Sequence, residues 1–204
     1  DITATLTGSD VSFSAPADFN GSETFTITVS DSELTDSQNI TVTVNAVNDT
    51  PVATAGLSGT TNEDQNIVIT LSGTDIDGDA LTYSLDTDAT NGSVVIDGTL
   101  ATYTPTLNYN GDDTFSFTVS DGELSDTAEV TLTVTAVNDA PVLATVSDVS
   151  FDEDGSTSIS LSGSDVDGDD LTYSITAGTD ITATLTGSDV SFSAPADFNG
   201  SETF

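Results

Sequence analysis

The chain contains one 25-residue sequence twice, at residues 1–25 and again at residues 180–204. Two identical copies in one chain indicate a tandem array, in which similar units fold alike along the polypeptide. This repeat constrains the fold more than any single motif does, because the structure of one unit must also suit its neighbours. It also favours a function carried by the whole series, such as a stalk, over a single active site.

A shorter period of about 90 residues lies inside this repeat. The segment VNDTPV at 47–52 returns as VNDAPV at 137–142, and the acidic segment DIDGD at 75–79 returns as DVDGD at 165–169. We expect an adjacent copy or further chain to complete the cores of the partial repeats. The phase of the segments predicts three domains: the C-terminal part of one repeat at 1–47, a complete repeat at 48–137, and the N-terminal part of a third at 138–204.

Apolar residues alternate with threonine and serine through the complete repeat, as in Phe115, Phe117 and Val119. Period two predicts β-strands with one face in a core, and turn sequences such as Asp97-Gly98 separate the strands. About seven short strands without a helical period predict an all-β chain of tandem seven-stranded antiparallel Greek-key β-sandwiches, cadherin-like or Ig-like, joined end to end. The first extended run of the complete repeat is expected from Ala53 to Leu57. The residues expected to face the core are Ile67, Ile69, Leu71, Tyr83, Phe115, Phe117, Val119, Val130, Leu132 and Val134.

The charge of the chain has one sign. There is no lysine, arginine or histidine against 35 Asp and Glu, which gives a formal net charge of -35. No residue can neutralise a phosphate, so nucleic acid and anionic membrane surfaces are excluded as partners, and no apolar run is long enough for direct membrane insertion. Without His, Cys or Lys only a carboxylate pair could catalyse a reaction, and we expect no enzyme activity. An acidic disordered spacer is the alternative that the alternating strands oppose.

The acids gather in loops beside glycine and asparagine, as in the Asp75-Ile76-Asp77-Gly78-Asp79 segment. An EF-hand loop would need glycine at its sixth position and glutamate at its twelfth, and this segment has Ala80 and Asp86 there. Carboxylate and amide oxygens still suit calcium, whereas soft metals would need cysteine or histidine. The alternative is an acidic turn and a plain linker without any ion.

These segments together resemble the cadherin repeat. LSGTDIDGDALTYSL and LSGSDVDGDDLTYSI are similar to the cadherin stretch in which a DxD motif precedes a strand, and VNDTP resembles the cadherin linker DxNDNxP. The nearer resemblance is to bacterial cadherin-like repeats of large exported surface proteins, in which VNDAPV joints punctuate long arrays. The cadherin DRE position reads Asn108-Tyr109-Asn110 here, without its glutamate, so we expect fewer than three ions at a joint.

The resemblance implies Ca²⁺ at the joints between consecutive domains. One joint would draw on Asn48, Asp49, Asp75, Asp77 and Asp121. The next would draw on Glu63 or Asp64, Asn138, Asp139, Asp165 and Asp167.

The function implied is a structural extender of an extracellular, secreted or cell-surface protein, such as a bacterial adhesin or a fibre. Calcium would make its joints rigid, and its partners would be neighbouring repeats of the same protein or copies of itself in a fibre. Two alternatives remain: a glycan- or partner-binding β-sandwich module, and a subunit of a self-assembling extracellular filament. A binding module should carry a loop or an aromatic cluster that its neighbours lack, whereas a stalk repeats itself.

Overall fold

The computed structural model describes all residues 1–204, and its regular elements are β-strands throughout. The chain divides into two compact units, residues 1–136 and residues 137–204. The structure contains no helix that could span a bilayer.

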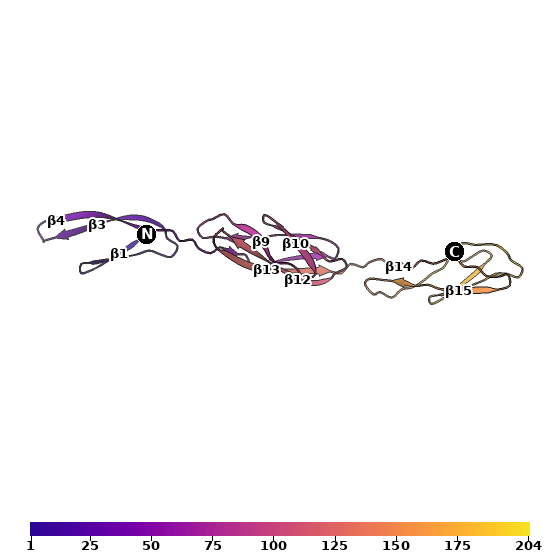
Figure 1. Cartoon of the computed structure of the whole chain (residues 1–204). Helices are drawn as coiled ribbons and strands as arrows, with labels where there is room; N and C mark the ends of the chain where they lie inside the picture. Colours follow the sequence, from indigo (N-terminus) through magenta and orange to yellow (C-terminus); the bar gives the residue numbers. More distant parts are fainter. The chain divides into compact units, whose positions relative to one another are not determined.

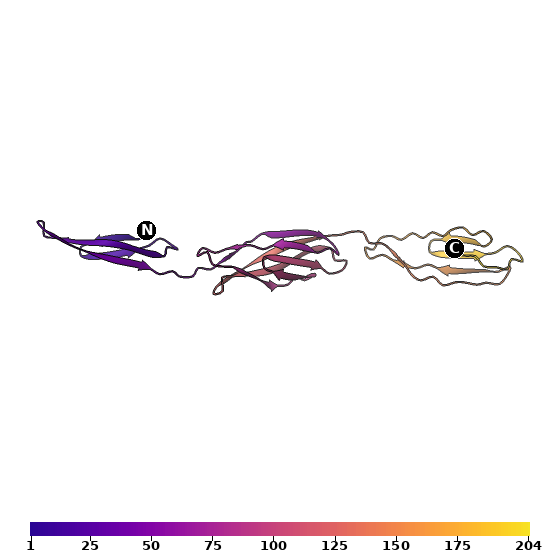
Figure 2. The same cartoon turned by 90° about the horizontal axis from the view of Figure 1, so that it is seen from above.

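The complete domain, inside the first unit, is a sandwich of a four-stranded and a three-stranded sheet (Figures 1 and 2). These seven strands confirm the predicted fold class. The four-stranded sheet has the order β6 (Leu57–Asn62), β13 (Ser125–Thr135), β12 (Gly111–Ser120) and β9 (Thr82–Thr87). The three-stranded sheet has the order β10 (Gly92–Asp97), β11 (Leu100–Pro105) and β7 (Ile67–Thr70), and the short strands β5 (Val52–Ala53) and β8 (Gly73–Thr74) pair beside them.

The core of this domain consists of the predicted alternating residues. Phe117, Val119 and Val130 are fully buried, and Ile67 and Tyr83 pack against the core while partly buried. Thr114, between core positions on β12, is exposed, which confirms the predicted register. Tyr103 on β11 is fully buried as well. Burial of these aromatic and aliphatic side chains is the main stabilising term for the domain.

The sequence analysis predicted antiparallel sheets, and the four-stranded sheet differs from this prediction at one strand pair. β6 pairs in parallel with β13, with Leu57 opposite Val130 and Asn62 opposite Thr135. The expected first strand at 53–57 is also wrong, because the extended chain there makes only the short β5 and the longer strand begins at Leu57. β6 is the first long strand after the N-terminal linker and lies beside β13, the last strand of the domain, and the two strands run in the same direction.

Residues 1–47 repeat the second half of that domain. Their hairpins are β1 (Thr3–Thr7) with β2 (Asp10–Ser14), and β3 (Gly21–Ser30) with β4 (Thr35–Val44). Gly21 pairs with Val44 as Gly111 pairs with Val134 in the complete domain, so the β3–β4 hairpin has the register of β12–β13.

The second unit, residues 137–204, contains two small sheets. A two-stranded sheet pairs β14 (Val142–Leu143) with β16 (Gly163–Ser164). A three-stranded sheet has the order β15 (Ser156–Ser160), β18 (Asp189–Ser193) and β17 (Thr182–Thr186).

The two identical 25-residue sequences agree in conformation for most of their length. Each forms a hairpin of the same register, and the ring centroids of Phe13 and Phe25 lie 5.2 Å apart against 5.3 Å for Phe192 and Phe204. The two copies differ in their last residues: 21–25 begin β3, whereas 200–204 form no strand. β3 is held by β4, and the second unit holds no counterpart of β4.

Candidate metal centre at the domain linker

The linker before the complete domain is held by two acidic loops of that domain. The side-chain amide of Asn48 donates a 2.9 Å hydrogen bond to Oδ2 of Asp121, which follows β12. The backbone N–H of Asp49 donates a 2.8 Å hydrogen bond to Oδ2 of Asp77, in the loop between β8 and β9. Pro51, two residues after Asp49, is buried. Asp75 joins this set, because its carboxylate accepts a hydrogen bond from the backbone N–H of Asp77. Hydrogen bonds and the peptide bond between Asn48 and Asp49 therefore connect all five residues predicted for this joint.

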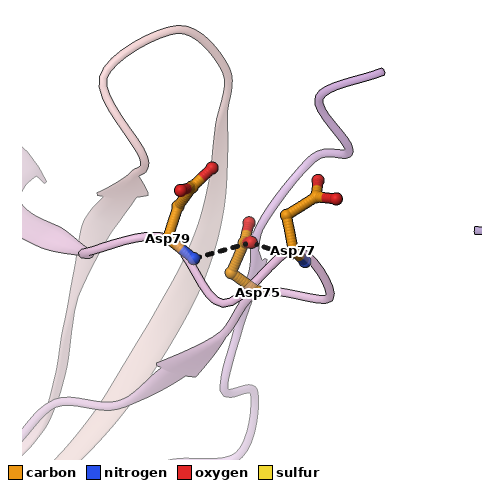
Figure 3. Close-up of side chains that lie close together, drawn as sticks. All are labelled: Asp75, Asp77 and Asp79. Atoms are coloured by element: carbon orange, nitrogen blue, oxygen red, sulfur yellow. Dashed lines mark hydrogen bonds between the residues drawn. The ribbon is translucent and has the colours of Figure 1, made fainter. Parts of the chain in front are cut away.

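The loop that carries Asp75 and Asp77 is folded around the first of them. Oδ1 of Asp75 accepts hydrogen bonds from the backbone N–H of Asp77 at 2.9 Å and of Asp79 at 3.2 Å (Figure 3). Gly78 adopts φ of 80°, a conformation that glycine reaches without steric cost, and it permits the tight turn. One carboxylate oxygen from each aspartate lies within 4.8 Å of the others, and Figure 3 shows the three carboxylates on the same side of the loop.

The charges at this linker are not compensated by any basic group. Oδ2 of Asp75 is buried and has no hydrogen-bond partner. Partial burial of Asp49, with repulsion from Asp18, Asp77 and Asp75, raises its pKa. The pKa of Asp121 is lowered instead, because its carboxylate accepts hydrogen bonds from the N–H groups of Leu124 and Glu123 and from Asn48. Hard oxygen donors with one buried, unpartnered oxygen fit a calcium ion.

The second unit repeats part of this arrangement within itself. The N–H of Asp139 donates a 2.7 Å hydrogen bond to Oδ2 of Asp167, and the N–H of Asp167 donates a 3.0 Å bond to Oδ1 of Asp165. The counterpart of the Asn48 contact is missing, since the amide of Asn138 donates to the backbone oxygen of Asp139. The second unit thus brings together four of the residues predicted for the second joint, without an equivalent of Asp121: Asn138, Asp139, Asp165 and Asp167.

Glu63 and Asp64 lie at the other end of the complete domain from Asp121. Glu63 is only 4% exposed, and its N–H donates a 2.9 Å hydrogen bond to the backbone oxygen of Thr135, the last residue of β13. Asp64 adopts φ of 60° and accepts the N–H of Asn108 at 2.9 Å, which holds a neighbouring turn. The structure places neither with the first linker, and their role at the following joint stays a prediction.

Sequence reasoning missed two carboxylates. Asp79 joins the cluster of Asp75 and Asp77, and its recurrence as Asp169 was the available signal. Asp113, on β12, is only 6% exposed and accepts hydrogen bonds from the N–H of Asn91 at 2.9 Å and from the hydroxyl of Tyr103 at 3.0 Å. Burial of Tyr103 and this bond raise the pKa of the tyrosine.

The role of Asp113 is structural. Its counterpart in the second unit is Glu202, whose carboxylate accepts the N–H groups of Thr179, Asp180 and Ile181. These bonds lower the pKa of Glu202. In both units a carboxylate near the start of the same repeat segment fixes the loop that precedes the hairpin. No sequence signal marked it, because the residue is Asp in one repeat and Glu in the other.

The repeated sandwich and its linkers agree with a known family. The model of the bacterial Ig domain matches residues 48–133 and residues 138–204, which together make up more than half of the chain. The chain belongs to the bacterial Ig domain family. Domains of this family are commonly extracellular. The matches begin at the two Asn-Asp pairs, so the linker acids open each bacterial Ig domain.

This bacterial Ig chain is also similar to part of one curated protein. Chitinase A of Pseudoalteromonas piscicida is 33% identical over 131 residues, a match that covers 59% of this chain and 15% of the chitinase. The chain therefore spans a small part of the relative that it matches.

Solved structures with similar chains include two kinds of protein. An endo-fucoidan hydrolase of glycoside hydrolase family 107 matches at 20% identity with a TM-score of 0.39, over 96% of this chain and 33% of the hydrolase. Form II of human protocadherin-24 EC1-2 matches at 17% identity with a TM-score of 0.46, over 68% of this chain and 77% of the protocadherin.

Proposed function

We propose that this chain is an extender of an extracellular protein, built of tandem bacterial Ig domains that calcium holds rigid at their linkers. Such a segment would hold a binding tip away from a cell, as part of a surface adhesin or an extracellular fibre. The observation that supports the proposal best is the connection of Asn48, Asp49, Asp75, Asp77 and Asp121 at one linker. The uniformity of the repeats also favours a spacer, since nothing in the sequence distinguishes one repeat as a binding head.

Electrostatics supply the mechanism. Without a cation, the linker carboxylates repel one another, and each close pair costs about 1 to 4 kcal/mol depending on the local dielectric. A calcium ion bound to Asp49 and Asp77 would replace this repulsion with shared ligation by linker and domain, and so hold the linker against the domain. Calcium suits the irregular set of oxygens better than magnesium, which demands near-octahedral geometry and gives up its water reluctantly. No group of this chain would act as a catalyst in that role.

The test is calcium binding by the full chain, measured by isothermal titration calorimetry after removal of metal with a chelator. We expect Asp77→Asn to weaken binding by about tenfold or more, because it removes a charged ligand from the linker site. Asp97→Asn is the matched control, since Asp97 is an exposed acid at the end of β10, away from the linker. Equal affinity of the two variants, or binding of magnesium as tight as that of calcium, would contradict the proposal.

The stiffening itself is tested by small-angle scattering at a concentration where the chain is monomeric. Calcium should increase the maximum dimension of the wild-type chain and leave that of Asp77→Asn nearer its metal-free value. The same dimension for the wild-type chain with calcium and with chelator would show that any bound ion does not stiffen the joints.

A second candidate function is a carbohydrate-associated module, and the similarity to a chitinase is the observation that favours it. In such an enzyme these domains would either space a catalytic domain from its anchor or bind the polysaccharide themselves. Depletion of the chain from solution by insoluble chitin separates the two roles. Binding that survives chelation would favour a glycan-binding module, whereas no depletion would leave only the spacer role.

A further inference from the structure

A two-stranded ribbon, β5 with β8, lies between the linker and the acidic loop of residues 75–79. The linker directly precedes β5, and the acidic loop directly follows β8. The two strands are antiparallel, with Val52 opposite Thr74, so both segments leave the ribbon at the same end. Asp49 and Asp77 continue this register, and the N–H of Asp49 donates to Oδ2 of Asp77 there. The ribbon therefore determines which linker residue meets the loop.

The second unit builds the same ribbon within itself. β14 pairs with β16 and places Val142 opposite Ser164. The register continues to Asp139, whose N–H donates a 2.7 Å hydrogen bond to Oδ2 of Asp167. Two repeats that differ in sequence at these short strands thus join the linker to the acidic loop in the same way.

The ribbon packs tightly on its β8 side, where it requires a glycine. A Cβ atom on Gly73 would lie 3.0 Å from the backbone oxygen of Val52 and 3.1 Å from Cγ1 of Val119, closer than most Cβ atoms approach other atoms. Gly163, the counterpart in the second unit, would place a Cβ atom 3.0 Å from Cδ1 of Leu171. β8 therefore lies directly against β5 and the core, which leaves no room for β5 to move in that direction.

The other side of β5 is held by a carboxylate of β13. The N–H of Ala53 donates a 2.9 Å hydrogen bond to Oδ2 of Asp126, and this contact is partly buried. Ala53 is 6% exposed, so loss of the bond would leave its N–H without this acceptor in a buried position, which is costly. Ala53 and Asp126 lie four residues before Leu57 and Val130, the first pair of the β6–β13 ladder. The side-chain bond thus extends that ladder toward the linker.

The chain between Ala53 and Asp49 is stiff and can transmit this restraint. Pro51 fixes its own φ, and a proline restricts the residue before it, here Thr50, to extended conformations. Pro51 is also buried. Few backbone rotations therefore remain between the N–H that is bonded to Asp126 and the carboxylate of Asp49.

We propose that Asp126 is a positioning residue of the linker site: its hydrogen bond to Ala53 holds β5 on the domain and thereby keeps Asp49 opposite Asp77. Asp126 acts through β5 and gives no oxygen to the ion. Docking of the linker by this bond does not require an ion, whereas its effect on calcium binding rests on the extender function proposed above. The two parts are therefore tested separately.

Hydrogen exchange in chelator, followed by NMR, tests the docking. Asp126→Ala removes the acceptor and should speed exchange by about tenfold or more at the N–H groups of both Ala53 and Asp49. Asp126→Asn keeps an amide oxygen as acceptor without the charge, so both N–H groups should stay within about threefold of the wild-type rates. The N–H of Val130, in the β6–β13 ladder, should keep its protection in both variants, because the change is local.

Three results of this experiment would overturn the proposal. Faster exchange at Ala53 alone would show that the restraint does not reach the linker. Loss of protection at Val130 as well would make Asp126 a residue of general stability. Equal acceleration in Asp126→Asn and Asp126→Ala would assign the effect to the charge of Asp126.

Calcium titration followed at the N–H signal of Gly78, in the acidic loop, tests the consequence for the first linker site. Asp126→Ala should weaken calcium binding by about tenfold, as loss of a residue that orients metal ligands does, and Asp126→Asn should restore it to within about threefold of wild type. Glu129→Ala is the matched control, since it removes an exposed acid from β13 and should leave binding unchanged. Binding by Asp126→Ala as tight as wild type would overturn this inference alone. A wild-type chain that binds no calcium would instead refute the extender proposal, and the exchange rates in chelator would still decide the docking.

Discussion

The side-chain amide of Asn48 donates a 2.9 Å hydrogen bond to the carboxylate of Asp121, although 73 residues separate them in the chain. The bond joins the linker to the turn after β12, and the N–H of Asp49 is tied to Asp77 beside it. The linker is therefore docked on the domain that follows it.

This contact predicts a change in the acidity of Asp121. Asn48→Ala removes one of the hydrogen bonds that lower its pKa, so we expect the pKa to rise while staying below the ordinary value, since the N–H groups of Leu124 and Glu123 still bind the carboxylate. A titration of the side-chain carboxyl followed by NMR measures the shift. Asn45→Ala, at an exposed position, is the control, and an equal pKa in both variants would contradict the assignment.

The linker should respond to pH in the metal-free chain. The pKa of Asp49 is raised above its ordinary value, so its protonated form favours the folded linker, and the stability gained is lost as pH rises through the raised pKa. The pKa of Asp121 is lowered, so its contribution is lost only as pH falls below 3.8. Hydrogen exchange at the backbone N–H groups of residues 47–50 in chelator should therefore slow as pH falls from neutral toward 4, after correction for intrinsic exchange rates. Protection that decreases over this range would contradict the sign.

The repeat supplies matched positions for a core prediction. Phe117→Ala should reduce the free energy of unfolding of the complete domain by about 3 to 5 kcal/mol, because the side chain is fully buried. Ile27→Ala, at the corresponding position of β3, should change the free energy of unfolding little in chains kept monomeric, because the Ile27 side chain is exposed. Urea denaturation followed by tyrosine fluorescence measures both variants. A large effect of Ile27→Ala on the monomer would show that the face of β3 is already covered.

The buried pair of Tyr103 and Asp113 should also contribute to stability. Tyr103→Phe keeps the ring and removes the hydroxyl that donates to Asp113, so we expect a loss of about 1 to 3 kcal/mol in the free energy of unfolding. The control is Tyr83→Phe, at a ring that is only partly buried. Equal stability of the two variants would mean that the N–H groups of Thr90 and Asn91 suffice for Asp113.

Much of the fold could be predicted because its core residues alternate locally. Phe115, Phe117 and Val119 specify their face of β12 without any long-range information. β6 could not be placed this way, since its sequence LSGTTN has little apolar alternation and its strand exists through pairing with β13. Its position depends on a partner more than sixty residues away, which periodicity does not reveal.

The linker site could be predicted for a different reason. The recurrence of Asn-Asp and DxDGD at one spacing indicated residues that act together, and the structure links them through hydrogen bonds. Asp113 could not be predicted, since an aspartate next to Asp112 in a polar strand segment gives no sign that one of the two is buried. Only the fold brings Tyr103 and the loop at 90–91 to its carboxylate.

The parallel pairing of β6 with β13 has a mechanical consequence. Six residue pairs, from Leu57–Val130 to Asn62–Thr135, join β6, the first long strand after the N-terminal linker, to β13, the last strand before the C-terminal linker. Tension applied through the two linkers pulls these parallel strands in opposite directions along their length. The pairs are then loaded together in shear, and none can open before its neighbours as in an unzipping hairpin. A pulling force must therefore break the whole ladder at once, which slows forced unfolding, the rate that matters for a domain under tension.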